Sequence, residues 1–194
     1  MDSITQAALG ASIAGAVAGK TLGRSALLTG ALLGTLPDLD VVIDYGTAVA
    51  NFTQHRGFSH SLFILAPLSL LIAWGLWRWK PLISYQRWLA LVGLILITHP
   101  LLDAFTTYGT QLFWPIGPPV AINSIFIIDP LYTLPLLAGC LAFLYRPPAS
   151  RTVAAGLLLS SLYLGWTLVA QQIITERVRP ALANAGMEQA ALMV

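Results

Sequence analysis

The stretch "HSLFILAPLSLLIAWGLWRW", His60 to Trp79, decides the fold class of this protein. Arg78 is the only residue in it that carries a full charge, and apolar side chains fill almost all the other positions. A helix needs about 20 mostly apolar residues to cross a bilayer. The sequence therefore predicts a membrane-spanning helix here, with His60 at its polar end.

The composition of the whole chain agrees with this prediction. Of the 194 residues, 57% are hydrophobic and 9% are charged, whereas an ordinary globular domain carries about 25% charged residues. So few charges could not cover a soluble core of this size with polar surface. The net charge of +2 is too small to indicate nucleic acid as a partner. We therefore expect a membrane protein that binds no nucleic acid.

Five further segments are predicted to be helical on either side of this stretch. Two of them are shorter and rich in glycine and alanine, which allows helices to approach closely, so we expect these two inside the bundle instead of facing lipid. The predicted fold is an all-α polytopic membrane helix bundle of about six helices, two of them short. The five segments are Ile4 to Ala18 and Ser25 to Leu36, which are short, and Gln86 to about Tyr108, Asp129 to Tyr145 and Thr152 to Ile174.

The charges divide between the two ends of such a bundle. If the helices alternate in direction, most basic residues fall on one side, which the positive-inside rule identifies as cytoplasmic; they are Lys20, Arg24, Arg78, Lys80, Arg87, Arg146 and Arg151. All acidic residues and all histidines fall on the other side, namely Asp2, Asp38, Asp40, Asp44, Asp103, Asp129, Glu176, Glu188, His55, His60 and His99. The division predicts two extracytoplasmic termini and a polar cluster at the outer helix ends.

The chain after Ile174 is more polar than the segments before it. We predict one membrane-embedded domain over residues 1–175 and a polar C-terminal tail over residues 176–194. The tail is either an amphipathic surface helix or the start of a longer extracytoplasmic region.

Four short motifs bring ionisable residues to the outer end. In "PDLD", Asp38 and Asp40 are two residues apart, which in an extended segment points both to the same side. In "HRGFSH", we expect His55 in a loop, with Ser59 capping the next helix and His60 opening it.

The other two motifs belong to later helices. In "HPLLD", His99 and Asp103 are separated by four residues and so lie on one helical face, although Pro100 can bend or restart the helix there. In "DPLY", Asp129 stands at a helix start, with proline in the first turn.

Imidazole and carboxylate groups are the ligands that Zn²⁺ accepts. The residues predicted to bind metal are Asp38, His55, His60, His99 and Asp103. They could supply one divalent ion or two, and we expect zinc, with manganese as the alternative. A second ion would favour phosphoester chemistry, because two metals can stabilise the attacking and leaving oxygens.

Four segments together resemble a known family: "MDSITQAALGAS", "LLGTLPDLDVV", "HRGFSHSL" and "HPLLDAFTTYGTQLFWP". They resemble the YdjM family of bacterial inner-membrane proteins, described as membrane-bound metal-dependent hydrolases. The resemblance covers roughly residues 1–175, and longer members continue into an extracytoplasmic C-terminal region. It implies a multi-helix membrane protein with a metal site.

Two details of the resemblance bear on the ligand set. A distant similarity to the zinc-dependent phospholipase C group includes a His-xxx-Asp pair, which His99 and Asp103 alone match here. Members of the YdjM family often carry histidine at the position of Gln6. Glutamine is a poor zinc ligand, so if that histidine binds metal, the site here has lost a ligand or is weaker.

The resulting hypothesis is a membrane-embedded hydrolase that cleaves a phosphoester of a lipid or lipid-linked substrate. A metal-bound water would be the nucleophile, Asp40 or Asp129 the general base, and Arg56 the phosphate-binding residue. Tyr108 would donate to the leaving group. Arg56 could instead pair with an aspartate.

Two functions of other classes stay open. Ionisable residues in membrane proteins commonly mark transport or ion pathways, although here they gather at one side only. A non-catalytic scaffold, in which a metal fixes the outer loops, would use the same ligands.

Overall fold

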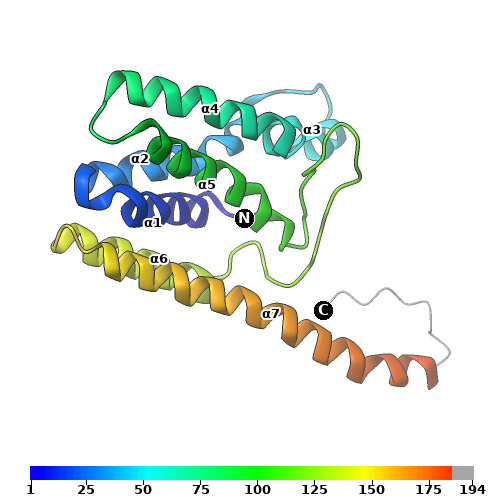
Figure 1. Ribbon diagram of the computed structural model, residues 1–194. Helices are drawn as coiled ribbons and strands as arrows, with labels where there is room; N and C mark the ends of the chain where they lie inside the picture. Colours follow the sequence, from blue (N-terminus) through cyan, green and yellow to red (C-terminus); the bar gives the residue numbers. More distant parts are fainter. Residues whose placement is uncertain (185–194) are drawn as a thin grey trace.

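The computed structural model describes residues 1–184, which form a bundle of three helical hairpins (Figure 1). Its six main helices are α1 (Ser3–Leu22), α2 (Arg24–Thr35), α4 (Leu62–Trp79), α5 (Tyr85–Ala104), α6 (Pro130–Tyr145) and α7 (Ser150–Asn184). The described residues contain isolated bridges but no strand. The all-α prediction is confirmed, and each predicted helix has its counterpart.

Three shorter elements fill the connection between α2 and α4. They are the 3-10 helix η1 (Pro37–Val42), the helix α3 (Ala48–Gln54) and the 3-10 turn η2 (Phe58–His60). The sequence did not predict α3. This connection carries five of the predicted site residues, Asp38, Asp40, His55, Arg56 and His60.

Helix α1 lies at the centre of the bundle, where it packs against α2, α5, α6 and α7. A Cβ atom on Gly10 would lie 2.2 Å from the carbonyl oxygen of Gly30, so the α1 and α2 backbones are in direct contact. The prediction of a close-packed, interior helix is thus confirmed for α1. It holds for only one face of α2, because Leu28 and Leu32 on the other face are each 64% exposed.

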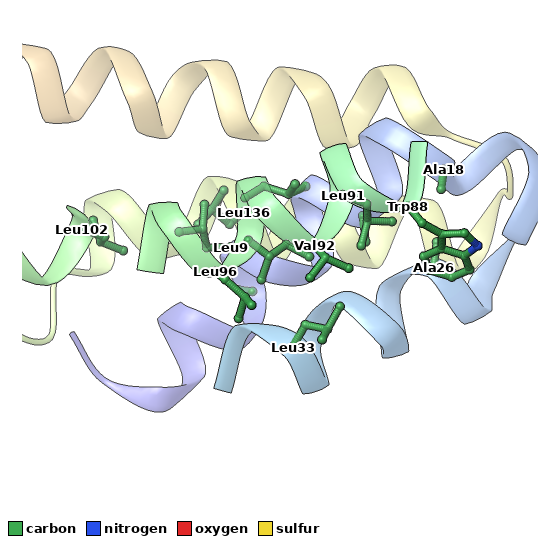
Figure 2. Close-up of a cluster of buried hydrophobic side chains, with 14 of the residues drawn as sticks. Leu9, Ala18, Ala26, Leu33, Trp88, Leu91, Val92, Leu96, Leu102 and Leu136 are labelled. Carbon is green, nitrogen blue, oxygen red and sulfur yellow. The ribbon is translucent and has the colours of Figure 1, made fainter. Parts of the chain in front are cut away.

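The main hydrophobic core forms where α5 packs against α1 and α2, and α6 adds side chains to it (Figure 2). Trp88, Leu91 and Leu96 of α5 are almost fully buried there, together with Leu136 of α6. Helix α5 is therefore held between the hairpins, which fixes the position of the site residues near its C-terminal end.

Within residues 1–184, three helices are long and apolar enough to cross a membrane: α4, α5 and residues Ser150–Leu182 of α7. The segment predicted from Asp129 to Tyr145 forms the shorter apolar helix α6, of 16 residues. Helix α7 has 35 residues and so a length of about 52 Å, against a hydrocarbon core of about 30 Å. The predicted boundary at Ile174 therefore falls inside a continuous helix, and Glu188 lies outside the described residues.

Helix α5 ends at Ala104, before the predicted end near Tyr108. The chain returns at this point, and the N–H groups of Ile122 and Ser124 donate to the carbonyl oxygens of Ala104 and Phe105. These bonds satisfy carbonyl groups that a longer helix would have used. The helix runs through Pro100 without a break.

The turns of the three hairpins lie at one end of the bundle (Figure 1). This end carries the seven basic residues assigned to one side from the sequence, and the Arg24 guanidinium donates to the Leu144 carbonyl oxygen, which links two of the turns. That this basic end of the bundle faces the cytoplasm stays a prediction.

Candidate metal centre

Four side chains converge between η1, η2 and α5: Asp38, His60, His99 and Asp103. One ligand atom of each lies within 4.8 Å of the others. His60 Nε2 and His99 Nε2 are 3.1 Å apart. Asp38 Oδ1 lies 3.5 Å from the first nitrogen and 3.4 Å from the second, and Asp103 Oδ2 lies 3.2 and 3.6 Å from them.

These spacings are those of a metal-ligand set. A tetrahedral zinc site with bonds of about 2.0–2.1 Å places its donor atoms about 3.3 Å apart. The five separations that involve a histidine nitrogen range from 3.1 to 3.6 Å, and the two carboxylate oxygens lie within 4.8 Å of each other. The donors are two imidazole nitrogens and two carboxylate oxygens, a combination that zinc accepts. The four residues therefore fit one divalent ion in both spacing and chemistry.

The outer ring nitrogens of both histidines have fixed partners. His99 Nδ1 lies 2.7 Å from the carbonyl oxygen of Gly34, an acceptor, so this nitrogen carries the proton. The Ser59 hydroxyl donates to Asp40 Oδ2 at 2.6 Å, and its oxygen lies 2.8 Å from His60 Nδ1. With its one hydrogen directed at Asp40, Ser59 accepts a bond from His60 Nδ1–H.

Both inner nitrogens are consequently acceptors in the neutral imidazoles. Four acceptor atoms then face one another in a buried space, an arrangement that is repulsive unless a cation lies among them. Partners that fix the tautomer in this way are the usual second shell of metal-bound histidines.

The carboxylate oxygens of the cluster support this interpretation. Asp103 Oδ1 accepts bonds from Gln6 Nε2 and from the amino group of Met1. Asp103 Oδ2, which faces the histidines, has no hydrogen-bond partner among the described residues, and neither has Asp38 Oδ2. Buried acceptors without hydrogen-bond donors are costly, and a cation would remove that cost.

The histidines and carboxylates also change each other's protonation. Burial opposes ionisation of Asp38, but the adjacent His60 and His99 side chains overcome it and hold the pKa of Asp38 well below its usual range. Burial likewise acts to lower the pKa of His60, yet Asp103 and Asp38 raise it above its ordinary value. The two carboxylates therefore stabilise a proton on His60 when no metal is bound.

Local structure explains how the sequence places these groups. His99 and Asp103 are one turn apart on α5, as predicted. Asp38 and Asp40 do not point to the same side, because η1 is a 3-10 helix with about three residues per turn. Asp38 reaches His60 and His99, whereas Asp40 reaches His55 and Ser59.

The start of α4 also differs from the prediction. His60 belongs to η2, and Ser61 is the N-cap residue of α4. Ser59 is therefore free of the capping role and instead connects Asp40 to His60.

His55 lies beside the four-residue cluster and outside it. Its Nδ1 is 2.9 Å from Asp40 Oδ1, and its side chain is 27% exposed. The structure thus brings together four of the five predicted metal ligands and places the fifth on a neighbouring carboxylate.

Arg56 is buried against Asp103, with Nε 3.6 Å from Asp103 Oδ2. Its guanidinium donates to the carbonyl oxygens of Gly109 and Met1 and lies 4.7 Å from the centre of the Tyr108 ring. These contacts correspond to the predicted alternative in which Arg56 pairs with an aspartate.

Asp129 is the N-cap residue of α6, as its motif predicted. Its Oδ1 accepts bonds from the N–H groups of Leu131 and Tyr132, and its Oδ2 accepts one from the Tyr163 hydroxyl. The carboxylate is therefore occupied by helix capping and by α7.

Gln6 lies beside the cluster, where the resemblance expects a histidine. Its Nε2 donates to Asp103 Oδ1 and to the His99 carbonyl oxygen, each at 3.1 Å. The residue thus orients one ligand. Sequence reasoning missed the carbonyl of Gly34 and the link through Ser59, because the first is a backbone group and the second depends on the fold of η2.

Comparison with known proteins places this chain in a family. The chain is 36% identical to the inner membrane protein YbcI of Escherichia coli (strain K12) over 112 residues, which cover 57% of this chain and 64% of YbcI. It is 29% identical to the uncharacterized protein YfhP of Bacillus subtilis (strain 168) over 104 residues, or 53% of this chain and 32% of YfhP.

The matches thus span less than two thirds of either relative. No solved structure matches the chain. The model of the YdjM inner membrane protein family matches residues 1–174, and the chain therefore belongs to this family.

Proposed function

We propose that this protein is a membrane-embedded, metal-dependent hydrolase that cleaves a phosphoester of a lipid or lipid-linked substrate at the extracytoplasmic surface. The observation that carries the proposal is the convergence of four acceptor atoms, from Asp38, His60, His99 and Asp103, at metal-ligand spacing. The substrate class follows from the location at one end of apolar helices, the depth at which phospholipids carry their phosphoester bonds.

A divalent ion at these four residues, zinc or manganese, would polarise a phosphoryl oxygen and lower the pKa of a water molecule. The side chains of His60, His99 and Asp103 are almost fully buried, whereas that of Asp38 is 14% exposed. The substrate would consequently approach from the side of Asp38, and the other three ligands exclude water from the rear of the site.

Asp40 is the carboxylate best placed to accept a proton. It borders the cluster through Ser59, and His55 on its other oxygen is the more exposed member of the pair. In this proposal Asp40 is the general base, and His55 passes the proton from Asp40 to solvent. Asp129, the other candidate for this role, is engaged by α6 and Tyr163.

Arg56 acts in the proposal as a positioning residue for Asp103. Its charge offsets the two cluster carboxylates, and its contacts with the carbonyl oxygens of Gly109 and Met1 hold the side chain in place. Binding of a phosphate by Arg56 would require it to leave these partners. Tyr108, beneath the guanidinium, lines the pocket from which a leaving group would depart.

One observation favours a second candidate function, a metal-stabilised scaffold without turnover. Four protein ligands complete a tetrahedral set, as in structural zinc sites, whereas catalytic sites keep a position for water. In the hydrolase, water must also bind the metal. The partly exposed Asp38 would therefore have to leave the metal, or the metal would have to bind more than four ligands.

Asp40→Asn separates the two functions. The variant removes the proposed base and keeps all four ligands, so a hydrolase should retain its metal and lose release of headgroup or phosphate from phospholipids and polyprenyl phosphates in vesicles. The matched control is Asp44→Asn, an exposed loop aspartate outside the cluster, which should retain turnover. If metal-loaded wild type cleaves none of these lipids while metal removal lowers its thermal stability, the scaffold is favoured.

A further inference from the structure

An apolar groove runs along α4 beside the metal centre. It has a volume of about 500 Å³ and is lined mainly by aliphatic and aromatic side chains, among them Leu36, Leu39, Phe58, Leu65, Leu68 and Ile72. The polar side chains in its wall are those of Asp40 and Ser59, the residues that connect to His60. One end of the groove therefore lies next to the second shell of the metal centre.

The rim of the groove exposes aliphatic surface. Val42 is 79% exposed and Leu39 is 56% exposed, both in η1. Exposed apolar area costs about 25 cal/mol per Å² in water, and this cost is absent in hydrocarbon. Because α4 is a candidate membrane span, the groove would open sideways into the bilayer.

A second, more polar pocket of about 300 Å³ adjoins the groove. Its lining includes Tyr45, Asn51, His55 and Tyr108, and it shares Asp40 and Ile43 with the apolar groove. Asp40 and Ile43 therefore stand between two neighbouring cavities, one with mainly apolar walls and one with more polar walls. A ligand that fills both must have an apolar part and a polar part.

We infer that the groove binds one acyl chain of a membrane phospholipid, with the headgroup in the polar pocket. The inference rests on the proposed function and assigns its substrate class, since the bond between chain and headgroup would then lie at Asp40. A peptide helix fits less well: a cylinder 10 Å across occupies about 420 Å³ per turn, so the groove would hold little more than one turn.

Photo-crosslinking tests this inference. The probe is a phosphatidylglycerol with a diazirine near the end of one acyl chain, diluted into phosphatidylethanolamine vesicles that contain the purified protein. After irradiation, labelled residues are mapped by proteolysis and mass spectrometry. We expect labelling concentrated on η1 and on Leu68 and Ile72 of α4, well above that of Leu158 and Leu159, which are exposed on α7.

Variants that fill the groove provide the second arm. Leu68→Trp should lower labelling of η1 severalfold, whereas Leu71→Trp, on the exposed face of α4 and outside the groove, should leave it unchanged. If Leu68→Trp alters metal content, Ile72→Trp replaces it. Uniform labelling of all exposed apolar faces, or equal labelling with and without the bulky residue, would overturn the inference.

Two further results separate this inference from the proposed function. His60→Ala removes a metal ligand and no groove residue, so its labelling should persist. Metal-loaded wild-type protein that is labelled but cleaves no lipid would contradict the hydrolase and keep the groove. If a photoreactive amino acid in place of Leu68 crosslinks to a second copy of the chain instead of to lipid, the groove belongs to an oligomer interface and the inference is overturned.

Discussion

Asp103 and Asp129 are both aspartates at a helix end, and both were candidate site residues, yet their surroundings differ. The Asp129 carboxylate accepts two backbone N–H groups of α6 and the Tyr163 hydroxyl. Asp103 has donors on Oδ1 only, and its Oδ2 faces two histidine nitrogens and Arg56.

The difference teaches how to separate a structural carboxylate from a functional one. A carboxylate whose oxygens accept capping hydrogen bonds is already satisfied. Its contribution to the stability of the helix is enough to explain its presence. A buried carboxylate oxygen that faces other acceptors has no such explanation, and a metal ion bound among those acceptors would remove its cost. The predictions below test this distinction, in order of decreasing effect.

Removal of a ligand should have the largest effect. His60→Ala and Asp103→Ala each delete one of four donors, and we expect bound metal in the purified protein to fall to background, beyond the tenfold to hundredfold loss of affinity that is typical of second-shell changes. Mass spectrometry of metal content provides the measurement, with Asp129→Ala as the control. Equal metal content in all three variants would remove the distinction between the two aspartates.

Loss of the second shell should have an intermediate effect. Ser59→Ala breaks the link between Asp40 and His60 Nδ1, and we expect metal affinity to fall about tenfold to hundredfold, measured by competition with a chelator. Ser61→Ala is the matched control, because its hydroxyl donates to the Trp114 carbonyl oxygen away from the cluster. Identical affinities of both variants would exclude a role for this link.

Metal affinity should decrease as pH falls. Despite burial, Asp103 and Asp38 hold the pKa of His60 above its ordinary value of 6.5, and this proton must leave before Nε2 can bind a metal. Affinity should therefore fall about tenfold for each pH unit below the raised pKa. In His60→Ala this proton is absent, so any residual affinity should depend less on pH.

The metal-free protein should show the opposite trend in stability. A raised pKa of His60 stabilises the folded state fully below pH 6.5, and this contribution is lost as pH rises through the raised value. Thermal unfolding of metal-free protein should therefore occur at lower temperature at pH 9 than at pH 6, as scanned by circular dichroism. If the unfolding temperature of His60→Ala changed with pH as much as that of wild type, His60 would be neutral in the metal-free cluster.

Asp129 should affect stability alone. Asp129→Ala removes an N-cap and should cost about 1 kcal/mol of unfolding free energy, with metal content unchanged. Asp129→Asn should restore most of this stability, because asparagine caps helices about as well as aspartate. If Asp129→Asn kept its stability and its metal but lost lipid cleavage, Asp129 would be the general base after all.

Sequence reasoning recovered the helices because their signals are local. Long apolar runs, glycine-rich segments and the proline after Asp129 each predict an element without knowledge of the fold. The pairing of His99 with Asp103 is equally local, since it needs only the period of a helix.

The rest of the site depends on the connection between α2 and α4, where the sequence has no period to follow. The separate directions of Asp38 and Asp40 follow from the 3-10 geometry of η1, and the pairing of His55 with Asp40 follows from the return of the chain through α3. The acceptor for His99 is the backbone carbonyl of Gly34, a group that every residue type carries.

X-ray absorption spectroscopy at the zinc edge tests the central claim most directly. In protein loaded with one equivalent of Zn²⁺, the account predicts a shell of nitrogen and oxygen donors at about 2.0–2.2 Å, with the outer-shell scattering of two imidazole rings. A shell of oxygen alone, or a sulfur donor, which would have to be Cys140 or a methionine, would contradict the assignment of the metal to Asp38, His60, His99 and Asp103.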